Sequence, residues 1–239
     1  MENKWWEYYA VRYFVGTVIG AGIVAFLNEH PDSLYYGRLS LGDESTKTEA
    51  KFLDIGVTAA LGFAYCYIAS APVLTLHAAR AHLRLSTLKA HWVSHIICLS
   101  IAIAAAVFAV WRVLPPRAAI AAGFVIGMQF GLVLVALCTK FSIIEDFYRQ
   151  LAGTRSKAMP IKDDPPSAGL EYVTSYRHLR EHGNAFMIVI LEVILAYAIF
   201  CLPSMTYAFL FVAAWLLPAT FAWFLGTVLE SRLVSVPLP

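Results

Sequence analysis

Residues 118–139 read AAIAAGFVIGMQFGLVLVALCT, an apolar run without a single charged side chain. A helix that crosses a hydrocarbon core of about 30 Å needs about 20 such residues, because each adds about 1.5 Å of length. Five other long apolar segments surround this one. The sequence therefore predicts an all-α fold, a polytopic membrane helical bundle with about six transmembrane helices at residues 8–27, 52–76, 92–114, 118–139, 185–202 and 207–229.

The composition excludes two large classes of protein. Hydrophobic residues make up 59% of the chain and charged residues only 14%, whereas a soluble domain has roughly 25% charged residues. The charges also lie mainly between the apolar runs, which is typical of a protein whose main partner is the lipid bilayer. The net charge of +2 is too small to indicate a nucleic-acid-binding protein.

The distribution of Lys and Arg predicts the orientation of the spans. If the N-terminus is cytoplasmic, 13 of the 18 basic residues fall on the cytoplasmic side and five on the other. Because positively charged loops resist translocation, both termini are expected in the cytoplasm. We interpret residues 1–239 as one integral membrane domain, placed in the bacterial inner (plasma) membrane, with residues 28–51 as an external loop.

Residues 140–183 form the largest polar segment on the predicted cytoplasmic side. FSIIEDFYRQLAG can continue the fourth span as a helix, KAMPIKDDPPSAG is rich in helix breakers, and LEYVTSYRHLREHGNAF resumes helical spacing before the fifth span. We predict a cytoplasmic helical hairpin inserted between spans 4 and 5. Such a hairpin is available to a soluble cytoplasmic protein partner.

Glycines recur at a spacing of four in two predicted spans. Gly123, Gly127 and Gly131 form a glycine ladder in the fourth span, and Gly16 and Gly20 have the same spacing in the first. Faces of this kind let helix backbones approach closely. They indicate packing within one subunit or an interface between subunits of a homo-oligomer or membrane complex, and both interpretations remain open.

The fifth span carries an acidic residue near its middle, Glu192 in MIVILEVILA. A carboxylate at that depth costs on the order of 3 kcal/mol or more, so it must be protonated, paired or hydrated. Gln129 lies at a similar depth in the fourth span, and its amide can hydrogen-bond Glu192. The pair indicates either an ion or proton relay, or a polar constriction in a pore, or simply an interhelical hydrogen bond.

Six of the seven histidines fall in three pairs near predicted cytoplasmic helix ends. Histidines four residues apart share a helix face, and neutral imidazoles suit Zn or Fe. The pairs therefore offer a metal-binding alternative to a plain interfacial role. They are His77 with His82, His91 with His95, and His178 with His182.

The three histidine pairs resemble the His boxes of membrane fatty-acid desaturases and hydroxylases, which are non-haem di-iron enzymes. Those families have adjacent His-His doublets in their later boxes, where this chain reads HWVSH and HLREH. The resemblance implies two irons only if Glu181, Asp146 or Glu145 completes the ligand set. HLREH also matches the H-x-x-E-H pattern of inverted zinc proteases, but the chain offers no soluble cleft for a substrate.

No Gly-rich phosphate loop and no G-x-S-x-G elbow occur in the sequence. We therefore favour a non-enzymatic, oligomeric membrane subunit without a cofactor, acting as a sensor, a pore-type effector or a scaffold. The alternative is a membrane-embedded His-ligated metalloenzyme, with Fe or Zn, acting on lipid-like substrates.

Overall fold

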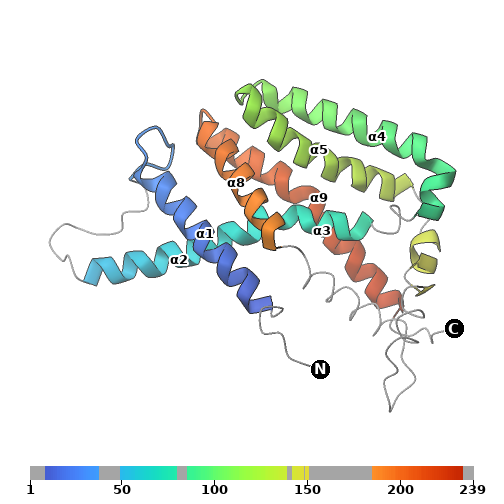
Figure 1. Cartoon of the computed structure of the whole chain (residues 1–239), viewed down its shortest axis with the longest axis horizontal. Helices are drawn as coiled ribbons and strands as arrows, with labels where there is room; N and C mark the ends of the chain where they lie inside the picture. Colours follow the sequence, from blue (N-terminus) through green and yellow to red (C-terminus); the bar gives the residue numbers. More distant parts are fainter. Residues whose placement is uncertain are drawn as a thin grey trace, which may run out of the picture. The chain divides into compact units, whose positions relative to one another are not determined.

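The structure is a computed structural model that describes residues 9–37, 49–79, 85–138, 142–147, 149–150 and 185–233. These residues are mainly helical and contain no strand, so the predicted all-α class is confirmed. Their helices include α1 (Tyr9–Glu29), α2 (Glu49–Ala69), α3 (Ala71–Ala78), α4 (Leu85–Trp111), α5 (Pro116–Cys138), α8 (Ala185–Cys201) and α9 (Met205–Leu233) (Figure 1).

Several helices have the length and apolarity of membrane spans. Among the described residues, four segments qualify: Ile55–Leu76, Trp92–Trp111, Pro116–Cys138 and Met205–Val228. Two shorter apolar segments, Tyr13–Glu29 and Met187–Cys201, lie in α1 and α8. The described part of the chain therefore has the character of a membrane protein with four candidate spans.

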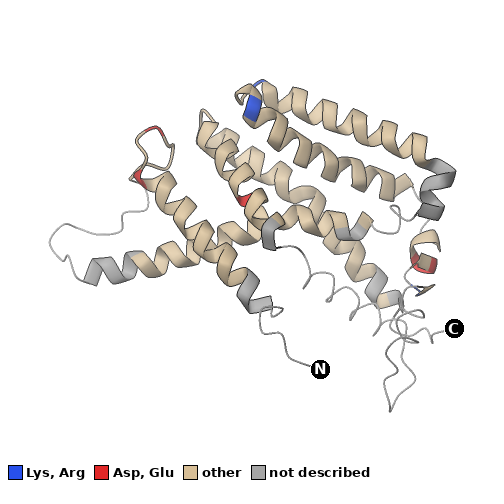
Figure 2. Cartoon of the chain, viewed as in Figure 1, with Lys and Arg blue, Asp and Glu red and all other residues tan. Residues whose placement is uncertain are grey.

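Charged side chains are scarce along the described helices. Figure 2 shows these helices almost entirely without Lys, Arg, Asp or Glu, with charges near helix ends and turns. One acidic position lies within α8 in Figure 2. It is Glu192, since the sequence of α8, AFMIVILEVILAYAIFC, contains no other charged residue. This helix carries the candidate site.

Proline and serine determine where α8 ends and α9 begins. Pro203 follows Cys201 by two residues, and a helix rarely continues through the residue before a proline. Ser204 then caps α9, because its side-chain oxygen accepts a hydrogen bond from the backbone N–H of Tyr207 at 3.4 Å. The two helices are thus joined by a tight turn.

The predicted span 52–76 is interrupted in the structure. α2 ends at Ala69 and α3 begins at Ala71, with a turn at Ser70 between them. Pro72 causes the interruption, because it lacks the N–H that would donate to the carbonyl four residues earlier. Together the two helices still provide one apolar segment, Ile55–Leu76.

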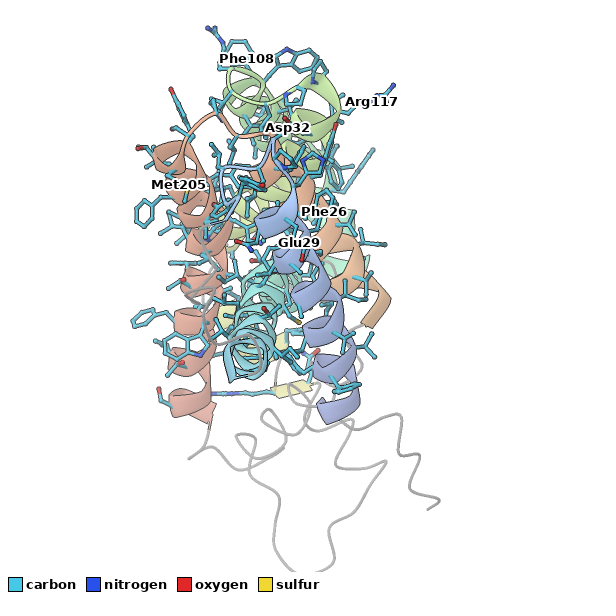
Figure 3. The ribbon with its side chains drawn as sticks, turned by 90° about the vertical axis from the view of Figure 1, so that its left-hand side faces the viewer. Phe26, Glu29, Asp32, Phe108, Arg117 and Met205 are labelled. Carbon is cyan, nitrogen blue, oxygen red and sulfur yellow. The ribbon has the colours of Figure 1, made fainter. Side chains whose placement is uncertain are left out.

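The described residues divide into two units. Unit 1 takes its residues from Met1–Ala71, Val107–Phe124 and Gly183–Leu216. Within it α1 packs on α2 and α8, and α2 also packs on α8. The turn after α1, the α4–α5 turn and the start of α9, marked by Asp32, Arg117 and Met205 in Figure 3, lie toward one end of this unit.

Unit 2 takes its residues from Pro72–Ala106, Val125–His182 and Leu217–Pro239. Its buried residues include Thr75 on α3, Gln129 and Leu132 on α5, and Pro218 on α9. Pro218 lies inside a helix, where it removes a backbone hydrogen bond. Unit 2 therefore contains two buried polar side chains, Thr75 and Gln129, and a part of α9 in which Pro218 leaves one backbone carbonyl without its helical hydrogen bond.

The predicted hairpin at residues 140–183 lies almost wholly outside the described residues. Of that segment the structure describes 142–147 and 149–150, which are helical. The hairpin therefore remains a prediction.

Candidate functional site

Glu192 is buried completely in unit 1. Its side chain is 0% exposed, and the polar group beside its carboxyl is the thiol of Cys66, a weak donor. A carboxylate in such surroundings is costly, since the charged form has lost its water. The local structure therefore favours the neutral, protonated acid.

Gly16 of α1 lies directly against this carboxyl. A Cβ atom built on Gly16 would lie 3.3 Å from Oε1 of Glu192 and would collide with Sγ of Cys66 on α2. The thiol of Cys66 is itself buried completely, and a thiol is only a weak donor. The absence of a side chain on Gly16 thus lets α1, α2 and α8 meet at one point, with an acid and a thiol inside the contact.

Tyr65 holds α8 to α2 at the same level. Its hydroxyl donates a hydrogen bond of 2.7 Å to the backbone carbonyl of Glu192, and this bond is buried. Because the hydroxyl donates to the backbone, it does not satisfy the carboxyl group. The bond fixes the position of the residue without neutralising its side chain.

Trp215 of α9 is hydrogen-bonded to the backbone of α2. Its indole N–H donates to the backbone carbonyl of Ile68 at 3.1 Å. Ile68 lies four residues before Pro72, so its carbonyl lacks the usual helical donor. Trp215 is 0% exposed and replaces that donor.

The arrangement around Glu192 is suited to binding a proton. A protonated carboxyl carries no charge, so it can stay packed against Gly16 and Cys66. An ionised carboxyl needs water or a cation, and both carboxyl oxygens are buried among protein atoms. Loss of the proton is therefore expected to loosen the contact of α1, α2 and α8.

Gln129 has a polar neighbour within unit 2. In unit 2 its side-chain oxygen accepts a hydrogen bond of 3.3 Å from the hydroxyl of Thr75, while its amide nitrogen has no partner among the described residues. Gln129 and Glu192 belong to different units. A hydrogen bond between their side chains therefore stays a prediction.

The glycine ladder of α5 lies against α4. A Cβ on Gly123 would lie 2.6 Å from the Cα of Val107, and one on Gly127 would lie 2.7 Å from the carbonyl oxygen of Ala102. A Cβ on Gly131 would approach the side chain of Leu99 at 2.9 Å. All three glycines of the ladder thus face α4 of their own chain.

Gly20 contacts the backbone of Gly62 on α2, so the glycines of α1 also face a neighbouring helix. A Cβ on Gly62 would lie 2.7 Å from the carbonyl oxygen of Thr17. In the described structure both predicted glycine faces are therefore occupied by helices of the same chain.

Most of the histidine pairs lie outside what the structure describes. His82, His178 and His182 are not described, and the side chains of His77 and His91 are likewise outside it. His95 lies on α4. The described residues contain no group of three or more His, Cys, Asp or Glu arranged to hold a metal ion. Metal binding by the histidine pairs therefore remains a prediction.

Sequence reasoning missed four residues of the site, namely Tyr65, Cys66, Gly62 and Trp215. Two of them belong to a pattern of small residues on α2, since Thr58, Gly62 and Cys66 recur every four positions. That spacing is the same signal that identified the other glycines. No local pattern predicts that Trp215 bonds to the backbone of α2, because the partners are far apart in sequence.

No protein-family model matches the chain, and neither a curated protein nor a solved structure matches it.

Proposed function

We propose that this protein is a non-enzymatic membrane subunit that senses protonation through Glu192. In this proposal the neutral acid keeps α1, α2 and α8 packed, and loss of its proton separates them. The change in packing is the signal that the subunit passes on. Among the three roles considered from the sequence, this proposal selects the sensor and names a proton as its signal. It needs no cofactor.

The observation that carries the proposal is the complete burial of a carboxyl group whose side-chain neighbour for hydrogen bonding is the weak thiol donor of Cys66. A residue whose only role is to join two helices is expected to use its side chain in a bond. Here Tyr65 joins the helices through the backbone of Glu192. The carboxyl group is left available for a proton.

The packing favours a sensor over a pore. Glu192 lies against Gly16 and Cys66 inside one chain, so the acid is enclosed by neighbouring helices. An acid that lines a pore must contact water in the conducting state. A sensor needs only two packing arrangements with different affinities for a proton.

The proposal includes a six-span topology. In it, α1 and α8 are the fifth and sixth spans, in addition to the four candidate spans. Helix α1 has 21 residues, enough for about 30 Å at about 1.5 Å per residue. With 13 basic residues on the same side as both termini, the termini are cytoplasmic and the segment 140–183 faces a soluble partner. The bacterial inner membrane is the proposed location.

A homo-oligomer or a larger membrane complex is also part of the proposal. Helix α4 supports it, because the segment Trp92–Trp111 is strongly apolar and no residue of it is buried. That surface is available to lipid or to another subunit. Mass measurement of the purified protein in detergent distinguishes the two.

The thiol of Cys66 reports on the proposed change. In a variant that keeps Cys66 and replaces Cys98, Cys138 and Cys201 by Ser, we would measure the rate of modification by a small maleimide between pH 6 and pH 9. If ionisation of Glu192 opens the contact, the rate rises more steeply with pH than thiol ionisation alone requires. The protein is held in lipid nanodiscs throughout.

Glu192→Gln is the matched control, because glutamine keeps the shape of glutamate and does not ionise. It contains the same thiol, so any pH dependence that it shows belongs to the thiol chemistry. A ratio of wild-type to variant rates that increases with pH supports the proposal. A constant ratio contradicts the proposal, provided that thermal denaturation shows both proteins to be folded.

A further inference from the structure

The turn that follows α1, residues 28–37, is folded against unit 1. A backbone hydrogen bond of 2.9 Å between its first and last residues closes it. Within the turn, the ring of His30 lies 5.1 Å from the ring of Phe26 on α1 and 5.1 Å from the ring of Phe200 on α8, measured between centroids. These contacts fix the turn at the ends of both helices.

Tyr35 of this turn lies close to Tyr65 of α2. Tyr35 is half-buried, and the two phenol groups are near enough to interact electrostatically. The backbone N–H of Tyr35 donates to the hydroxyl of Ser33 at 3.2 Å, and Ser33 is buried. The turn thus brings a hydroxyl group of its own to the residue that is bonded to Glu192.

The hydroxyl of Tyr65 lies on the side of Glu192 that faces the turn. It donates to the backbone carbonyl of Glu192 at 2.7 Å and interacts electrostatically with this residue. The carbonyls of a helix point toward its C-terminal end, and α8 ends at Cys201, next to the Phe200 that contacts the turn. The titratable side chains placed against Glu192 are Tyr65 and Cys66 of α2.

Toward the other end of α8 the described surroundings of Glu192 are apolar. Residues 185–191 of α8 read AFMIVIL, and Ile188 lies beside Gly16 of α1. On α2, Tyr67 is 61% exposed, and the hydroxyl of Ser70 donates locally to the carbonyl of Tyr67. The buried hydroxyl groups near Glu192 in the described structure are therefore on the side of turn 28–37.

We propose that Glu192 exchanges its proton with the side of the membrane on which turn 28–37 lies, by way of the hydroxyls of Tyr65 and Tyr35. This inference rests on the function proposed for Glu192, with α1 as a span, and names the compartment whose pH is sensed. Each hydroxyl accepts one proton on its oxygen and releases its own, so it is unchanged after the transfer. A relay of this kind needs no permanently open channel.

One-sided changes of pH test the assignment. The full-length protein with Cys66 as its single cysteine is reconstituted into lipid vesicles, and impermeant beads that bind an N-terminal tag retain the vesicles with that terminus outside. Turn 28–37 then faces the lumen, because α1 separates it from the N-terminus. With one side at pH 6 or pH 9 and the other at pH 7.5, we would measure the rate at which membrane-permeant N-ethylmaleimide modifies Cys66. Each rate is divided by that of Glu192→Gln under the same conditions.

Raising the lumenal pH from 6 to 9 should increase this ratio at least about threefold, since three pH units can shift a protonation equilibrium by much more. The same change in the bulk solution should leave the ratio unchanged. A ratio that follows the bulk pH, or both sides equally, overturns this inference and leaves proton sensing intact. A ratio that follows neither side contradicts proton sensing by Glu192, and with it this inference.

The part played by Tyr35 is tested by kinetics in the vesicles that the beads do not retain, in which turn 28–37 faces the bulk. After a rapid jump of bulk pH, we would follow the change in tryptophan fluorescence that Glu192→Gln lacks. Tyr35→Phe keeps the ring and removes the hydroxyl, so it should slow the change severalfold without altering its final amplitude.

Tyr36→Phe is the matched control for Tyr35→Phe, because Tyr36 belongs to the same turn and is 56% exposed. Its time course should equal that of the wild type. An unslowed response in Tyr35→Phe, or equal slowing in both variants, overturns the route through Tyr35. Circular dichroism confirms that each variant is folded.

Discussion

Trp215 donates its indole N–H to the backbone carbonyl of Ile68, at a nitrogen-to-oxygen distance of 3.1 Å. That carbonyl lacks a helical donor because Pro72 stands four residues later. The indole therefore completes the hydrogen bonding of an interrupted span. In a bilayer, where no water is present to satisfy a backbone group, such a replacement is needed wherever proline breaks a helix.

Trp215→Phe should lower the free energy of unfolding by about 1–2 kcal/mol, because a buried carbonyl then loses its donor. Unfolding in mixed micelles with increasing SDS measures the change. Trp223→Phe is the control on the same helix, since Trp223 is 60% exposed. Its effect should stay within about 0.5 kcal/mol.

Restoring the missing backbone donor tests whether the lost hydrogen bond to Ile68 causes the destabilisation by Trp215→Phe. Pro72→Ala supplies an N–H four residues after Ile68, so Trp215→Phe should cost less when it is combined with that substitution. If Trp215→Phe is equally destabilising in the wild type and in the Pro72→Ala variant, the hydrogen bond to Ile68 is not the cause.

Gly127→Ala should destabilise the bundle. The added Cβ would collide with the Cα of Ile103 and lie 2.7 Å from the carbonyl oxygen of Ala102, and backbone atoms cannot move aside cheaply. We expect a loss of about 1–3 kcal/mol, which is typical of overpacking. Thermal denaturation in detergent is the measurement.

Gly22→Ala is the matched control, because a Cβ at Gly22 meets nothing within 4 Å. It should leave stability unchanged or raise it slightly, since alanine favours helix more than glycine does. Equal melting temperatures for Gly127→Ala and the wild type would show that the glycine ladder does not hold α4 and α5 together.

Reporter fusions after residues 40 and 160 should report opposite sides of the membrane. The proposed six-span topology places residue 40 outside and residue 160 in the cytoplasm, because 13 of 18 basic residues lie on the side of both termini. Alkaline phosphatase and green fluorescent protein fusions provide complementary signals. Activity of the same reporter at both positions would require an even number of crossings between them and contradict the topology.

The metalloenzyme alternative makes a separate prediction. The sensor proposal expects no stoichiometric Fe or Zn in protein purified without a His tag. Metal analysis by mass spectrometry is the measurement. Iron or zinc at about one or two per chain, lost in a variant with His178→Ala and His182→Ala, would instead favour the metalloenzyme.

The helices were largely predictable because long apolar runs leave few alternatives in a membrane. The run at residues 118–139 predicted α5 to within a few residues, and Pro203 and Ser204 mark the turn between α8 and α9. The interruption at Ser70 was not predicted. Pro72 is its local cause, but the hydrogen bond from Trp215 that makes the break tolerable depends on packing between distant segments.

The candidate site was predictable only in part. Glu192 stands out because its charge is unusual in an apolar run, whereas Cys66 and Tyr65 have side chains that are common in membrane helices. Their proximity to Glu192 depends on the close approach at Gly16. The sequence shows the glycine, but not which helix it faces.

The contact between Gly20 and Gly62 has a consequence for how the bundle assembles. Glycine has no side-chain rotamers, so the contact between these two glycines costs no side-chain entropy when α1 and α2 come together. The close approach of Gly62 to the carbonyl oxygen of Thr17 also suits weak Cα–H···O bonds. These two helices are neighbours in the sequence as well, so we expect them to associate first once the spans have been inserted.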